Sequence, residues 1–308
     1  MDILNRWQQL LILSLLVFST SGCTTTENIE VSNNLPPKYR GVSTIRIENY
    51  VQRLFIDLIG REATDNERNA FTLDLKKAEL HDSCRIRLVN LLLFDTTYRV
   101  GDSSYRHAFA QRIYNLSKAR FLEGASDQDI LRYISDYNFA ISVSRLNGDS
   151  IGVNYLKEKR KLYTDILNTR FNFKKGVINY NKMCVKMLNN PIYDLINMNS
   201  FNFINAIFDD LFARKPTRYE FEKSYQIIEY NIPSVIFFNW ASNKGEFCDI
   251  LVNSDAFYEA QIRWFYYTLL QRNASEGEVH KLFASYFFNQ SIEDVINSIV
   301  ITDEYAQF

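Results

Sequence analysis

The chain has 308 residues, of which 46% are hydrophobic and 15% aromatic, so it can form a folded core and is not a disordered protein. Only 10 glycines and 5 prolines are present, which disfavours β-sandwiches, barrels and glycine-rich nucleotide-binding folds and favours long helices with short connections. Lysine and arginine total 35 and aspartate and glutamate total 36, so the net charge of −1 gives no indication of nucleic-acid binding.

The N-terminus has the features of an export signal. Residues 10–18 read LLILSLLVF, an apolar run that would form a helix of about 14 Å, too short for a hydrocarbon core of about 30 Å. We therefore predict the core of a signal peptide. Small residues then lead to Cys23, and this stretch resembles the lipobox of bacterial lipoproteins, with Thr20 where that family more often has Leu. The resemblance implies cleavage after residue 22 and lipid attachment at Cys23; the alternative is an ordinary secretory peptide with a coincidental cysteine.

Residues 24–39 are polar and lack helical periodicity, which predicts a flexible tether. The residue after the cysteine is Thr24, not the Asp that retains lipoproteins at the inner membrane in the best-known bacteria. The resemblance therefore implies an outer-membrane location, facing either the periplasm or the cell surface. No second apolar run of eighteen or more residues occurs in the sequence, so no membrane-spanning helix is predicted.

Three segments share one spaced pattern, which predicts a helical repeat. Each contains an aromatic residue, a leucine three positions later, an arginine, an alanine or proline, a hydroxyl residue and a glutamate. The aromatic residue and the leucine share a helical face, and the hydroxyl residue with the glutamate predicts a capping box at the next helix. Because the arginine follows the end of a helix, we interpret it as a clamp on free carbonyls or a nearby acid rather than as an anion site. The motif residues are Arg61, Thr64 and Glu67 in the first copy, Arg214, Thr217 and Glu220 in the second, and Arg272, Ser275 and Glu278 in the third.

Each predicted repeat also closes on an aromatic residue, Tyr98, Phe257 or Tyr305, which we expect to pack back on the first helix. The pattern resembles bacterial linker-like repeats of the type L-x-G-R-x-[PA]-[ST]-x-x-E that close in S-x-E-[YF] and occur in extracellular and envelope proteins. It is also similar to the N-terminal segment of an uncharacterised lipoprotein family and to a helical theme of phycobilisome linkers. The resemblance covers residues 45–100 and 200–308, and it implies an all-α, non-catalytic assembly role.

The residues between these copies also carry helical spacing. Ser126 with Asp129 predicts a helix start, and Asn190-Pro191 predicts a break. No Ser- or Pro-rich linker separates the parts, so we expect an all-α fold with one continuous helical body. The predicted divisions are a signal peptide at 1–22, the lipidated cysteine and tether at 23–42, a first helical repeat at 43–100, a helical middle region at 101–199, a second repeat at 200–258 and a third at 259–308.

Residue patterns for catalysis or metal binding are sparse. The three histidines are isolated and form no zinc motif. Cys84, Cys184 and Cys248 lie outside C-x-x-C motifs, and both one disulfide and buried free thiols remain open. The acidic pairs at 209–210 and 303–304 are adjacent residues that point apart on a helix, so we interpret them as solvated faces or caps. We therefore predict no enzymatic activity, no cofactor and no metal site.

The aromatic runs at 237–240 and 264–267 cover more than one helical face. A core role is the default, whereas exposure would indicate a protein interface or a sugar-binding platform, with Trp240, Trp264 and Tyr267 as the candidates. Our first hypothesis is a lipid-anchored scaffold or interaction subunit of an outer-membrane or periplasmic assembly, such as secretion, uptake or surface machinery. Its partners would be envelope proteins, an outer-membrane barrel among them. The alternative is a surface lipoprotein that binds a glycan or peptide through exposed Trp and Tyr.

Overall fold

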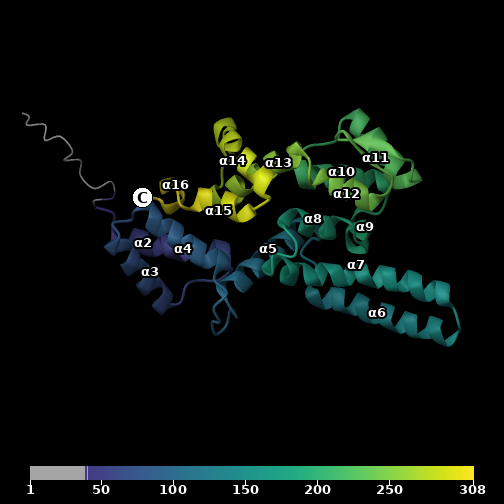
Figure 1. Ribbon diagram of the computed structural model, residues 1–308, viewed down its shortest axis with the longest axis horizontal. Coiled ribbons are helices and arrows are strands. Elements are labelled where there is room, and N and C mark those ends of the chain that lie inside the picture. The colour runs from purple at the N-terminus through teal and green to yellow at the C-terminus, as the bar shows by residue number, and fades with distance from the viewer. Residues whose placement is uncertain (1–38, 40) are drawn as a thin grey trace, which may run out of the picture. The chain divides into compact units, whose positions relative to one another are not determined.

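The computed structural model describes residue 39 and residues 41–308, and residues 41–308 form one compact unit. Cys23, the predicted signal peptide and most of the predicted tether lie outside the described residues. The described part of the chain is all-α: it contains 15 α-helices, one π-helical turn and a single two-stranded sheet (Figure 1). The elements are α2 (Thr44–Leu54), the π-helical turn η1 (Phe55–Ile59), α3 (Asp65–Lys77), α4 (Asp82–Phe94), α5 (Tyr105–Phe121), α6 (Asp127–Leu146), α7 (Ser150–Lys174), α8 (Tyr180–Leu188), α9 (Pro191–Asn197), α10 (Ser200–Phe212), α11 (Arg218–Tyr230), β1 (Ser234–Ile236), β2 (Asn239–Ala241), α12 (Lys244–Leu251), α13 (Asp255–Leu270), α14 (Glu276–Asn289), α15 (Ile292–Val300) and α16 (Asp303–Ala306).

Side-chain caps mark the helix starts in this chain, which has few glycines and prolines to separate its helices. Each of the described α-helices begins after a residue whose side chain accepts a hydrogen bond from a backbone N–H of the first turn. A cap of this kind stabilises a helix by about 1 kcal/mol. The predicted helix start at Ser126 is correct. Asn190 donates hydrogen bonds to backbone carbonyls in the last turn of α8 and caps α9, with Pro191 at the first helical position.

The run 237–240 is not helical as predicted. Pro233 follows the end of α11, and the chain then forms a β-hairpin in which Val235 pairs with Trp240. Phe237 and Phe238 both have positive φ, 44° and 62°, as a two-residue turn of type I′ requires. The helical interpretation failed because the aromatic run gave no sign of this turn, which usually contains Asn or Gly.

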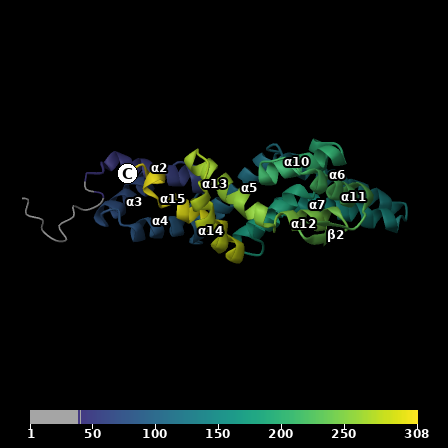
Figure 2. The same cartoon turned by 90° about the horizontal axis from the view of Figure 1, so that it is seen from above.

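Helices α6 and α7 form an antiparallel hairpin that projects from the other helices in Figure 1 and that overlaps α10–α12 when seen from above in Figure 2. Aromatic side chains hold the two helices together, because Tyr133 and Tyr137 lie 5.1 Å and 5.6 Å from Tyr163, measured between ring centroids. Helix α7 also packs against α5, α8 and α9, which makes the hairpin continuous with the helical body.

The last helix of the chain packs against the first described one (Figure 1). The fully buried Tyr305 donates a hydrogen bond of 2.8 Å to Asp57, and the Arg53 guanidinium lies 4.2 Å from the Tyr305 ring centroid. A second link is the buried ion pair of Arg106 on α5 with Glu293 on α15, at 2.7 Å. The Tyr305–Asp57 contact joins the first and third predicted repeats directly, and the Arg106–Glu293 pair joins the middle region to the third repeat.

The repeat-closing aromatics differ from expectation in one copy. Phe257 and Tyr305 are buried, but Tyr98 is 76% exposed and does not pack on the first helix. Tyr105, at the start of α5, fills that place instead: its ring lies 5.7 Å from Phe55 in an edge-to-face contact. The chain of the first repeat continues through a turn at 99–103, which moves the packed aromatic seven positions along.

Tyr98 and Tyr305 therefore give a matched pair of stability tests. We expect Tyr305→Ala to lower the free energy of unfolding by about 3–5 kcal/mol, because it removes a buried ring and its hydrogen bond to Asp57. Tyr98→Ala changes an exposed side chain and should alter it by less than about 0.5 kcal/mol. Urea unfolding of the two variants measures both, and equal effects would contradict the assigned packing.

Candidate functional site

The three motif copies form the same turn. The residue before each arginine ends a helix in the left-handed conformation: Gly60 with φ 84°, Ala213 with φ 52° and Gln271 with φ 56°. The capping boxes predicted at Thr64, Thr217 and Ser275 are all present. The arginine then turns back over the aromatic residue six positions before it, with 5.2 to 5.3 Å between guanidinium carbon and ring centroid.

The acid that each arginine clamps is the glutamate of its own capping box. Two parallel hydrogen bonds join the Nη atoms to the carboxylate at 2.6 to 2.9 Å, as Arg61–Glu67, Arg214–Glu220 and Arg272–Glu278. The same glutamates accept the backbone N–H of Thr64, Thr217 and Ser275 at 2.7 to 2.8 Å. The motif is therefore a structural unit, which we call the turn clamp.

The turn clamps differ in one contact. The Nε of Arg61 and one Nη bind a second carboxylate, Asp102, and Arg272 binds Glu304 through the same two nitrogens. Arg214 has no such second acid among the residues that the structure describes, and Glu220 is its one ion-pair partner there.

The carboxylates of the turn clamps ionise readily. Burial opposes the ionisation of Glu67, but hydrogen bonds from Arg61, Thr64 and Tyr105 outweigh it and lower its pKa to about 2. The hydrogen bonds from Arg272 lower the pKa of Glu278 to about 2, and those from Arg214 lower the pKa of Glu220 against the effect of burial. The clamps are therefore ion pairs throughout the physiological pH range.

A cleft opens beside the second turn clamp, and we call it the Trp264 cleft. It has a volume of about 500 Å³, in the range typical of ligand sites. Its walls come from the end of α5, the end of α10 with the turn after it, one face of α13 and the turn after α13. The lining residues are Arg120, Leu211, Phe212, Ala213, Arg214, Ala256, Glu259, Ala260, Arg263, Trp264, Tyr267 and Asn273.

The Trp264 cleft combines aromatic surface with guanidinium groups. Tyr267 is 63% exposed, and the Arg120 guanidinium lies over the Trp264 ring at 4.9 Å from its centroid. Arg263 is paired with Glu276 at 2.7 Å. Arg120 instead donates to neutral acceptors, the side-chain oxygen of Gln261 at 2.7 Å and a backbone carbonyl of α10. Hydrogen bonds thus hold the Arg120 guanidinium in place, but it has no ion-pair partner in the described part of the chain.

The structure brings two of the three predicted interface residues together. Trp264 and Tyr267 lie three positions apart on α13 and line the same cleft. Trp240 lies on β2, is 71% exposed and does not line the cleft. Sequence reasoning missed Arg120 and Arg263. The spacing of Ala256, Ala260, Arg263 and Tyr267 along one helical face was a signal for part of the wall, whereas Arg120 comes from a helix far away in the sequence.

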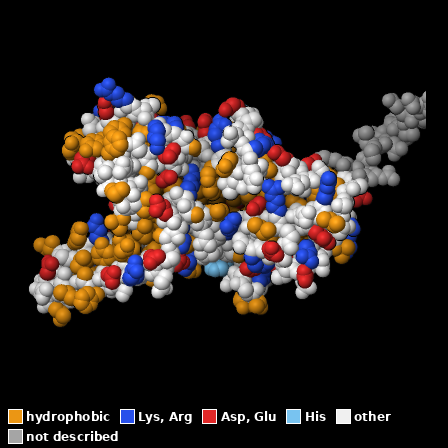
Figure 3. Space-filling model, turned by 180° about the vertical axis from the view of Figure 1, so that it is seen from behind, with side chains coloured by type: hydrophobic (Ala, Val, Ile, Leu, Met, Phe, Trp, Pro, Cys, Tyr) orange, Lys and Arg blue, Asp and Glu red, His pale blue; other side chains and the backbone are white. Residues whose placement is uncertain are grey.

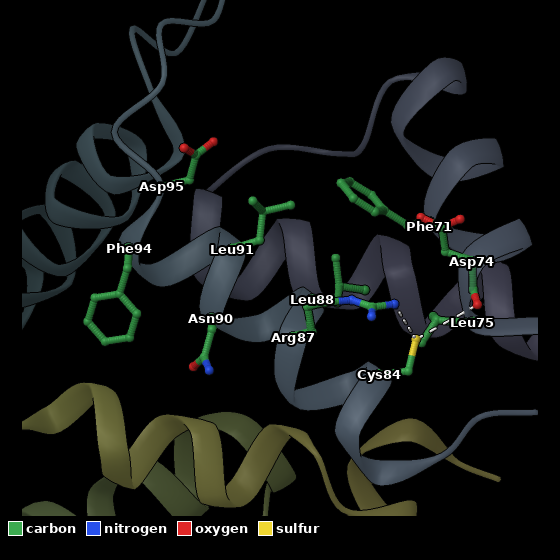
Figure 4. Close-up of a pocket in the computed structure, with 10 residues that line it drawn as sticks. All are labelled: Phe71, Asp74, Leu75, Cys84, Arg87, Leu88, Asn90, Leu91, Phe94 and Asp95. Atoms are coloured by element: carbon green, nitrogen blue, oxygen red, sulfur yellow. Dashed lines mark hydrogen bonds between the residues drawn. The ribbon is translucent and has the colours of Figure 1, made fainter. Parts of the chain in front are cut away.

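A second cavity lies in the first repeat between α3 and α4, with a volume of about 520 Å³ (Figure 4). Phe71, Leu88 and Leu91 supply apolar walls, and Cys84 lies at one end, where its sulfur is 3.6 Å from an Arg87 nitrogen. None of the nine motif residues lines this cavity. Its chemistry is that of an apolar groove, with polar groups at the rim.

The remaining candidate groups are structural. Cys84, Cys184 and Cys248 are buried free thiols, and burial raises the pKa of Cys184 and Cys248 to about 12, which disfavours the reactive thiolate. Asp210 is not solvated as expected, since it accepts a hydrogen bond of 2.7 Å from Tyr193 and burial raises its pKa. No cluster of three or more potential metal-ligating side chains occurs in residues 39 and 41–308. Within the same residues, no helix has the length and apolar character to span a bilayer.

Comparisons of the chain with protein-family models, with curated proteins and with solved structures give no match.

The first turn clamp predicts how stability responds to acid. The pKa of Glu67 is about 2 in the folded protein, against an ordinary value of 4.5. Its contribution is therefore complete above about pH 4.5 and is lost as the pH falls through about 2. We expect Glu67→Gln to lower the free energy of unfolding by about 1–3 kcal/mol at pH 7 and to flatten its decline between pH 4.5 and 2. Chemical unfolding across this range is the measurement, with the exposed neighbour Glu62→Gln as control. If the free energy of unfolding of Glu67→Gln declined with acid as steeply as that of the wild type, the assigned clamp would be contradicted.

Proposed function

We propose that the protein is a lipid-anchored scaffold or interaction subunit of a bacterial outer-membrane or periplasmic assembly, non-catalytic, which binds a partner protein through the Trp264 cleft. The observation that carries the proposal is the composition of this cleft. Trp, Tyr and Arg are the residue types enriched where binding energy is concentrated in protein interfaces, and Trp264, Tyr267, Arg120, Arg214 and Arg263 meet here.

The all-helical fold and its repeated turn clamps support a scaffold role. The clamps hold helix pairs together through internal Arg–Glu ion pairs, and of the motif residues Arg214 alone also lines the cleft. The resemblance of the motif to linker-like repeats of envelope proteins agrees with this role, and so does the lipobox-like stretch before Cys23.

The projecting hairpin supplies a second surface for assembly. Hydrophobic side chains gather along it in Figure 3, and the most exposed apolar side chains at its tip are Leu146, at 88%, and Ile151, at 85%. Phe139 on α6 and Tyr155 on α7 are also exposed. Contiguous apolar surface of this kind is typical of a site that is covered by a partner.

A glycan- or peptide-binding surface lipoprotein is the second candidate, and the exposed Trp240 favours it. An indole ring exposed on a β-hairpin offers a flat face for a sugar ring. Trp264 fits this role less well, because the Arg120 guanidinium lies over its ring. A glycan site would therefore centre on Trp240, and a protein interface on Tyr267 and Trp264.

The anchoring part of the proposal predicts the N-terminal mass. We expect the mature protein from membranes to begin at Cys23, with the added mass of several acyl chains, because stable anchoring takes more than one chain. Mass spectrometry of the N-terminal peptide measures this, and a Cys23→Ser variant is the control that should lack the acyl mass. A mature chain that starts elsewhere, or an unmodified Cys23, would rule out this anchor.

The interaction part predicts which surface retains a partner. After crosslinking in intact cells and mild detergent extraction, we expect one envelope protein to copurify reproducibly with the tagged chain. Tyr267→Ala should reduce its recovery by roughly tenfold, the effect of losing a binding hot spot, while an exposed side chain on α14, Phe288→Ala, should not. Quantitative mass spectrometry is the readout. A chain that purifies alone would favour the glycan candidate, for which Trp240→Ala should abolish binding on a glycan array.

A further inference from the structure

We infer that the Trp264 cleft binds a carboxylate of an acidic protein segment, which completes the turn clamp of Arg214. The inference rests on the proposed interaction function and specifies the chemistry of the partner. It follows from comparing the three copies of the turn clamp within this one chain.

In two copies the arginine binds two carboxylates. Its capping-box glutamate takes both Nη atoms, and a second acid takes the side of the guanidinium that carries Nε, with Nε–O distances of 3.1 Å for Arg61–Asp102 and 2.5 Å for Arg272–Glu304. The Nε of Arg214 has no hydrogen-bond partner among residues 39 and 41–308, although its pair with Glu220 matches the other copies. A planar guanidinium presents its donors in fixed directions, so the same side of Arg214 is oriented to receive a second carboxylate.

The sequence shows which position of the second copy lacks the additional acid. The closing segment 302–305 of the third repeat reads Thr-Asp-Glu-Tyr, and its counterpart 254–257 in the second repeat reads Ser-Asp-Ala-Phe. Ala256 therefore stands where the third repeat has Glu304, the acid that binds Arg272. Ala256 and Arg214 both line the Trp264 cleft, so the position without its acid opens onto a cavity of about 500 Å³.

The surroundings suit a peptide carboxylate more than a free small anion. Arg120 and Arg263 line the same cleft, and Glu259 is the one acidic residue among its lining residues. Phe212, Trp264 and Tyr267 add apolar contact area beside these charges. A ligand that places a carboxylate between apolar side chains matches both features, which describes an Asp or Glu within an apolar stretch of a protein.

The first test asks whether a carboxylate reaches Arg214. We expect Ala256→Glu to raise the urea midpoint of the full chain in detergent, because the introduced acid supplies the missing partner. The gain should vanish in an Arg214→Ala background, and Ala284→Glu, which adds the same charge at an exposed position of α14, should give no gain. A gain that is independent of Arg214, or no gain at all, would overturn the assigned geometry.

The second test asks whether the cleft selects acidic peptides. The peptide probes are two pools of fluorescein-labelled octapeptides. They are identical except that one pool has glutamate between apolar residues where the other has glutamine. Trigalacturonate serves as an acidic sugar probe. Fluorescence anisotropy with the full chain should show the glutamate pool binding roughly tenfold more tightly, with loss of binding in Ala256→Glu and a smaller loss in Ala256→Gln.

Equal affinity for the two pools, no binding of either, or binding retained by Ala256→Glu would overturn the inference. Trigalacturonate bound with the same sensitivity to Ala256→Glu would also overturn it, in favour of an acidic sugar. These outcomes are distinct from failure of the proposed function. If wild type and Ala256→Glu recover a partner protein equally, the interaction role is supported and the carboxylate site is overturned. If the cleft binds acidic peptides selectively but no partner is found in cells, the carboxylate site is supported and the proposed function fails.

Discussion

The bidentate pair between an arginine and the glutamate of its own capping box is the interaction on which this fold depends. The pair fixes the angle between two successive helices, because the arginine follows the end of one and the glutamate belongs to the first turn of the next. It also holds the arginine over a buried aromatic ring of the first helix. The turn thereby positions the left-handed residue, the cap and the aromatic face together, and it does so three times in the chain.

Local features of the fold could be predicted from the sequence. A helix end, a cap and the glutamate three residues later are encoded within a dozen positions, so the three turns and their capping boxes were predictable. The identity of the clamped acid was left open, because a carbonyl and a carboxylate were both within reach of Arg61. The β-hairpin at 234–241 was missed because Phe237 and Phe238 are unusual residues at positive φ.

Contacts between distant segments could not be predicted from one sequence. The burial of Tyr305 against Asp57, and the exposure of Tyr98 at the corresponding position, depend on where the chain of the first repeat turns after residue 98. The Trp264 cleft has the same origin. Trp264 and Tyr267 were visible as an aromatic run. Arg120, however, reaches the cleft from α5, more than a hundred residues earlier, and no local sequence pattern predicts that contact.

The arrangement explains how a repeat can carry a binding site without losing its fold. Every copy keeps the pair that builds the turn. Arg61 and Arg272 each bind a second acid, whereas Arg214 has none within the part of the chain that the structure describes. The second copy therefore keeps its structural pair, and in our proposal the remaining donors of its guanidinium bind the partner. The proposed lipid at Cys23 would hold this surface at the membrane, where envelope proteins are concentrated.

The central claim is that a protein partner covers the Trp264 cleft in the cell, and site-specific photo-crosslinking tests it most directly. A photoreactive phenylalanine analogue at position 267, in place of Tyr267, and the same analogue at position 288, in place of Phe288, would be irradiated in intact cells. The account predicts a single crosslinked envelope protein at position 267 and none at position 288. Crosslinks that are equal at the two positions, or absent at 267 from a folded and membrane-associated chain, would contradict it.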